Sequence, residues 1–141
     1  MRFARLLTAA SMVWLLAVTF AAAPTAQGNM TDEDYDKLMK AVGAANGAMR
    51  GAAKEMNAAG ISAEAAKMVA LFKDAEGFWK SRNNTEAAEW SATAMKHADA
   101  IAKATGPEAI MGAMKELGGT CQACHAKYRE GAPGSFSIKK G

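Results

Sequence analysis

The chain has 141 residues and a formal net charge of +3, and 50% of its residues are hydrophobic. Roughly 115 residues remain once the N-terminal segment is set aside, which is enough for one small domain with one core. No basic tract with interleaved aromatic residues occurs, and this argues against a nucleic-acid-binding protein.

Residues 1–28 have the pattern of a secretory signal peptide. A basic start that contains Arg2 and Arg5 precedes an apolar stretch from Leu6 to Ala23 and then small residues. Cleavage is expected between positions 23 and 28. Removal of the signal takes away Arg2 and Arg5 and lowers the net charge to about +1. An uncleaved membrane anchor is the alternative, but the stretch is short for a bilayer span and rich in alanine. We therefore expect an exported periplasmic protein with no stable membrane insertion after cleavage.

Residues 29–131 are expected to form the folded domain, which begins with a long helix. Thr31 is a good N-cap, and the acidic residues that follow it suit the positive end of the helix dipole. This helix is predicted to run to about Ala59, with Gly60 as its stop.

Two further helices are predicted in the middle of the chain. One should open at Ser62 and reach roughly Ser81. After an Asn-Asn-Thr turn, Asn84 or Thr85 can cap the next helix, which should end near Thr105.

A fourth helix is predicted to follow the break at Gly106 and Pro107, because proline suits the first turn of a helix. The segment after it is rich in glycine and small residues, so residues 132–141 are expected to be a flexible tail. Apolar residues recur every three or four positions in all four helical segments, which predicts one inward stripe on each helix. Alanine is abundant and β-branched residues are few, which disfavours a sheet.

The run Cys121-Gln122-Ala123-Cys124-His125 carries the clearest chemistry. Its C-x-x-C-H spacing is typical of covalent c-type haem attachment, in which each thiol adds to one haem vinyl group and the imidazole can bind the iron. Cys121, Cys124 and His125 lie at i, i+3 and i+4, on one face of the fourth helix. Because short connections make neighbouring helices antiparallel, we predict an all-α, up-down-up-down four-helix bundle with one covalently bound haem c near one end.

Two other kinds of site use a similar run of residues. A thioredoxin-like redox pair also reads C-x-x-C, but it belongs beside a βαβ pattern, and none is predicted here. A zinc site needs about four ligands, and beyond Cys121, Cys124 and His125 the chain offers only the distant His97. Both readings are less favoured than haem.

The segment from Gly118 to Arg129 resembles the C-terminal haem helix of the class II cytochromes c, the cytochrome c′ family. A second match, from Lys37 to Gly47, is similar to the first helix of that family, whose early residues line the distal face of the haem. Trp90 falls where the family often has a tryptophan near the start of its third helix. Together the matches span nearly all of the chain after the signal.

The resemblance implies a role for several residues. Cys121 and Cys124 would be the thioether attachments, His125 the proximal iron ligand and Arg129 a basic residue near the proximal side. Met39 occupies the position of the distal ligand in the six-coordinate, low-spin members of the family.

The surroundings of the haem follow from the same comparison. Tyr35 stands where many high-spin members have an arginine, which also favours the low-spin group, and Trp90 would lie near the haem. The residues alone leave Met39 open as a ligand, because the chain has ten methionines and most should fill gaps in the core. Met49 and Met56 lie on the same stripe, roughly 15 and 26 Å further along the helix.

The expected function is a single-haem electron carrier with His/Met ligation that exchanges electrons with periplasmic redox proteins. The alternative is a five-coordinate cytochrome c′-like protein that binds nitric oxide or carbon monoxide. An enzyme is not expected, because the distal stripe offers only Tyr35 and Asn46 as polar groups. His97 is a weaker candidate for the second axial ligand, and we expect it at the haem edge or half-buried. A homodimer stays open, since Gly43 and its neighbours permit close helix packing.

Overall fold

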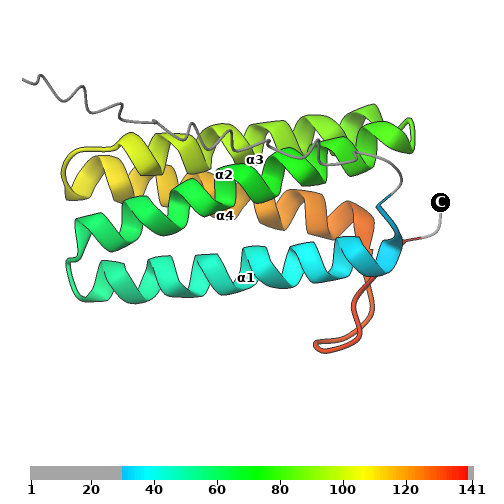
Figure 1. The fold of residues 1–141 in the computed structure, drawn as a ribbon, viewed down its shortest axis with the longest axis horizontal. Helices are drawn as coiled ribbons and strands as arrows, with labels where there is room; N and C mark the ends of the chain where they lie inside the picture. The colour runs from blue at the N-terminus through cyan, green and yellow to red at the C-terminus, as the bar shows by residue number, and fades with distance from the viewer. Residues whose placement is uncertain (1–29, 140–141) are drawn as a thin grey trace, which may run out of the picture.

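The computed structural model describes residues 30–139, so the signal peptide expected at residues 1–28 lies outside the described residues. The described part is all-helical, with four helices side by side and one small strand pair (Figure 1). No helix within residues 30–139 is both long enough and apolar enough to cross a membrane. The elements are α1 (Asp32–Lys54), α2 (Ala58–Ser81), α3 (Thr85–Lys103), α4 (Pro107–Tyr128), β1 (Arg129–Glu130) and β2 (Ser137–Ile138).

The start of α1 agrees with the prediction, but its end does not. Thr31 and Asp34 form a capping box, in which the Thr31 side chain accepts from the Asp34 N–H at 3.2 Å and the Asp34 carboxylate accepts from the Thr31 N–H at 3.2 Å. The helix ends at Lys54 rather than near residue 59, because Asn57 caps α2 by accepting a hydrogen bond from the Gly60 N–H at 2.9 Å. Gly60 therefore lies in the first turn of α2, and it is not a helix stop.

The other helix boundaries follow local chemistry more closely. Asn84 caps α3, since its side chain accepts from the Ala87 N–H at 3.0 Å. α3 ends at Lys103, slightly before the predicted Thr105, and Gly106 then turns the chain with a positive φ of 91°. Pro107 opens α4, as predicted.

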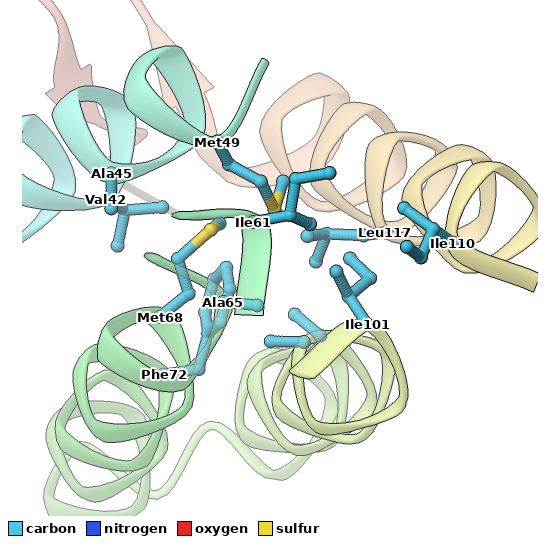
Figure 2. Close-up of a cluster of buried hydrophobic side chains, with 12 residues drawn as sticks. Val42, Ala45, Met49, Ile61, Ala65, Met68, Phe72, Ile101, Ile110 and Leu117 are labelled. Carbon is cyan, nitrogen blue, oxygen red and sulfur yellow. The ribbon is translucent and has the colours of Figure 1, made fainter. Parts of the chain in front are cut away.

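The main core lies between the four helices. α1 packs against α2, α2 against α3, and α3 against α4, whereas the backbones of α1 and α4 approach each other less closely and meet through side chains of the shared core. Figure 2 shows side chains from all four helices converging in this core. Met49 and Met68 are each only 1% exposed, and burial of such a side chain is worth about 1.5–3 kcal/mol.

A second, aromatic cluster closes one end of the molecule. The ring of Tyr35 stacks on Phe78 with centroids 4.1 Å apart, and Trp79 packs edge-on against both rings. Tyr128 at the end of α4 lies against Trp79, with centroids 5.4 Å apart. Ile138 completes the cluster. This end of the molecule therefore joins α1, α2, α4 and the C-terminal segment.

The C-terminal segment differs from the flexible tail expected at residues 132–141. Arg129–Glu130 pairs with Ser137–Ile138 as an antiparallel hairpin, in which Arg129 faces Ile138. Gly131 permits the turn, because its φ is +95° and a Cβ there would collide with the Ser135 carbonyl oxygen. The Lys139 N–H donates to the Tyr128 carbonyl at 2.9 Å. The hairpin is thus attached to the end of α4.

Candidate functional site

One small cavity, of about 40 Å³, receives side chains from all four helices. Six of the residues singled out in the sequence lie around it, including both cysteines and the adjacent histidine. The remaining lining residues are mostly apolar. The complete set is Tyr35, Met39 and Val42 from α1, Phe72 from α2, Trp90, Ser91 and Ala94 from α3, and Thr120, Cys121, Cys124 and His125 from α4.

The α4 wall carries the reactive groups. Cys121, Cys124 and His125 share one helical face, and all three are partly buried. Both thiols are free, and burial raises the pKa of Cys121 and raises that of Cys124 to about 11, so both are protonated at neutral pH. Burial, and then the positive charge of Arg129, lowers the pKa of His125. Its imidazole is therefore neutral near pH 7, which is the form that binds metals.

Met39 lies in the α1 wall of the cavity and is partly buried. Its rivals on the same helical stripe are elsewhere, since Met49 is 1% exposed in the main core and Met56 is 90% exposed in the turn after α1. Among the methionines of residues 30–139, only Met39 lines the cavity. Met39 is thus the methionine of residues 30–139 that shares this cavity with the cysteine and histidine side chains of α4.

Two buried hydroxyl groups in the cavity wall were not identified from the sequence. Ser91 donates to the Ala87 carbonyl at 3.0 Å, and Thr120 donates to the Glu116 carbonyl at 3.0 Å. Both bonds run back to the preceding turn of the same helix, a common arrangement for Ser and Thr. The inward stripe of each helix is the signal that could identify these positions. Apolar periodicity does not detect them, because their side chains are polar.

Tyr35 joins the cavity to the aromatic cluster. Its hydroxyl oxygen accepts a hydrogen bond from the Trp79 indole N–H at 2.9 Å. Burial raises the pKa of Tyr35 to about 12, in spite of this bond, and the nearby Cys124 adds to the shift. Tyr35 is therefore a neutral phenol at physiological pH.

Glu86 ties the start of α3 to the end of α4. Its carboxylate accepts two hydrogen bonds from the Lys127 ammonium, at 2.6 and 2.7 Å, and one from the Tyr128 hydroxyl at 2.8 Å. These two donors, in this order, lower the pKa of Glu86. The clamp holds the helical turn that also carries Cys124 and His125.

Three residues considered in the sequence analysis do not line the cavity. His97 is partly buried on α3 but lies outside the lining, and Asn46 on α1 does too. Arg129 is exposed at the start of β1, where its guanidinium lies 4.0 Å from the centre of the Phe136 ring. It acts on the cavity only through its charge, by lowering the pKa of His125.

The donor set suits a haem better than a bare metal ion. No group of three or more His, Cys, Asp or Glu side chains within residues 30–139 is arranged to hold a metal. A haem brings four nitrogen ligands of its own, so the chain would need to supply only axial ligands and attachment points, for which His125, Met39 and the two thiols have the right chemistry. The cavity volume is far smaller than a macrocycle, so haem binding would require α1 and α4 to move apart.

No protein-family model matches the chain, and comparisons with curated proteins and with solved structures give no match either. The resemblance to the class II cytochromes c therefore rests on the sequence motifs alone. The case for function depends on the side chains around the cavity and on their chemistry.

Proposed function

We propose that this chain is a single-haem c-type cytochrome that carries electrons in the periplasm, to which residues 1–28 would direct it. Cys121 and Cys124 would attach the haem, and His125 and Met39 would bind its iron. The observation that carries the proposal is that both thiols, the imidazole and the thioether line one cavity. The fold would be an up-down-up-down bundle, supported by the short connections at residues 55–57, 82–84 and 104–106.

Bound haem would supply a one-electron Fe(III)/Fe(II) couple. The residues of the chain would tune that couple and protect it. His125 is neutral and offers a lone pair, while the soft thioether of Met39 favours the reduced metal and so raises the potential. Val42, Phe72 and Ala94 give the cavity apolar walls, which would limit solvent reorganisation when the charge of the iron changes.

The same lining favours a carrier over an enzyme. The hydroxyls of Ser91 and Thr120 are committed to backbone carbonyls, so neither is a ready acid or base for a substrate. Tyr35 stays protonated near neutral pH because its pKa is about 12. An outer-sphere electron transfer needs none of these groups to titrate, and it needs only a transient contact with the redox partner.

The direct test is to express the full chain, signal included, in a bacterial host that matures c-type cytochromes. We expect a periplasmic product that stains for haem after denaturing electrophoresis and gives a low-spin, six-coordinate spectrum in both oxidation states. The double variant Cys121→Ala/Cys124→Ala should lose the stain. Gln122→Ala is the matched control, because this exposed residue lies inside the motif but has no assigned role, and it should keep the stain.

Two outcomes would contradict parts of the proposal. A wild-type chain without covalent haem would rule out a c-type cytochrome. A high-spin ferric spectrum, together with binding of carbon monoxide or nitric oxide at the sixth site of the ferrous form, would instead identify the five-coordinate gas-binding alternative.

A further inference from the structure

Tyr35 lines the cavity, and its hydroxyl accepts a hydrogen bond but donates none within residues 30–139. A phenol can donate one hydrogen bond as well as accept. The Tyr35 oxygen accepts from Trp79, but none of the hydrogen bonds among residues 30–139 uses its hydroxyl proton. The two other hydroxyls of the lining, on Ser91 and Thr120, already donate to backbone carbonyls.

The tyrosine is also held in place, which a useful donor requires. Its ring stacks on Phe78, which is 2% exposed, and it packs edge-on against Trp79, which is 4% exposed. The hydrogen bond from the indole fixes the position of the phenol oxygen and polarises its O–H group, because hydrogen bonds in a chain strengthen one another. The aromatic cluster thus holds the Tyr35 hydroxyl in place before any group enters the cavity.

We propose that Tyr35 donates its hydroxyl proton to an anionic acceptor on the group that occupies the cavity. The inference rests on the proposed haem. Such an acceptor can come from two sources, a propionate carboxylate of the haem or an anion bound to the iron when Met39 is displaced. Tyr35 is then a positioning residue, which orients the haem in the first case and selects anionic ligands in the second.

The test compares the haem-loaded wild type with Tyr35→Phe, which keeps the ring and removes only the hydroxyl. Tyr128→Phe is the matched control, because it removes a phenol from the same aromatic cluster that lies outside the cavity lining and already donates to Glu86. Two quantities are measured for each protein, namely the dissociation constant of cyanide for the ferric form and the midpoint potential as a function of pH. Resonance Raman spectra in H₂O and D₂O report the hydrogen bond itself.

Each acceptor gives its own result. If the acceptor is an iron-bound anion, Tyr35→Phe should weaken cyanide binding about tenfold or more and leave the potential unchanged. If it is a propionate, the variant should lower the potential, move its pH-dependent step to higher pH and remove the deuterium shift of the propionate mode, with cyanide binding unchanged. In either case Trp79→Phe, which withdraws the bond to the Tyr35 oxygen, should give a smaller change in the same direction.

Failure of this inference can be told from failure of the proposed function. Haem attached in wild type and variants, with Tyr35→Phe and Tyr128→Phe equal in both measurements, would overturn the role of Tyr35 alone. Absence of covalent haem from the wild type would overturn the proposed cytochrome and the inference with it.

Discussion

Alanine variants of Met39 and Met68 test whether the structure distinguishes a proposed iron ligand from a core residue. Both are methionines on inward helical stripes, so the sequence pattern treats them alike. Met39 is partly buried in the cavity wall, whereas Met68 is 1% exposed in the main core. We predict opposite phenotypes for their alanine variants.

The magnitudes follow from burial. Met68→Ala leaves a void in a closely packed core, and buried Met→Ala changes cost about 2–5 kcal/mol in the free energy of unfolding. Met39→Ala removes a side chain that is only partly buried and borders an existing cavity, so we expect a cost below about 2 kcal/mol in the haem-free chain.

The spectra should show the reverse order. Met39→Ala should abolish the far-red thioether-to-iron charge-transfer band, turn the ferric protein high-spin and lower its midpoint potential. Met68→Ala should keep the band. Urea unfolding of the haem-free chains followed by circular dichroism gives the free energies, and absorption spectroscopy of the loaded proteins gives the ligation state.

Two results would refute this reasoning. Persistence of the band in Met39→Ala would remove Met39 from the iron. A stability loss in Met39→Ala as large as that in Met68→Ala would mean that Met39 is a core residue and that the cavity is not a separate site.

The remaining predictions concern the elements that support the site. Glu86→Gln should destabilise the protein at pH 7, because the folded-state pKa of Glu86 lies below its ordinary 4.5. The stabilising contribution of Glu86 is present above that value and disappears as the pH falls through the lowered pKa. Wild type and variant should therefore have the same stability in urea titrations at acidic pH. Asn57→Ala should cost about 1 kcal/mol by removing the cap of α2, whereas no loss would contradict the assigned boundary. Gly131→Ala should release the hairpin without melting the bundle, seen as faster amide exchange confined to β1 and β2; faster exchange in α2 as well would contradict this.

The helices, and the placing of the two cysteines and the adjacent histidine on one helical face, could largely be predicted because both depend on neighbours in sequence. Thr31 and Pro107 specify helix starts through their own backbone and side-chain chemistry. The C-x-x-C-H spacing alone put Cys121, Cys124 and His125 on one face. The predicted α1–α2 boundary is wrong because Gly60 resembles a helix stop, whereas the actual signal is Asn57, which caps α2.

Other features depend on contacts between distant segments, which spacing does not reveal. Each strand of the C-terminal hairpin is only two residues long, too short for an alternating pattern, and Ile138 is held by aromatic residues of other elements. The hydrogen bond between Trp79 and Tyr35 spans 44 positions in sequence. The sequence identified Tyr35 through family resemblance, but it could not supply the partner that fixes its hydroxyl.

The wider separation of the α1 and α4 backbones relates the fold to the proposed haem site. Close packing of all neighbouring helices would give a more stable haem-free bundle, since contacts between apolar side chains are lost wherever helices separate. Here the backbones of the three other neighbouring pairs approach more closely than those of α1 and α4, which carry Met39 and His125 respectively. The aromatic cluster joins α1 and α4 at one end of the molecule, where the Glu86 clamp also joins α3 to α4. If haem binds as proposed, α1 and α4 would have to move apart to admit the macrocycle, while the aromatic cluster keeps one end of the two helices joined.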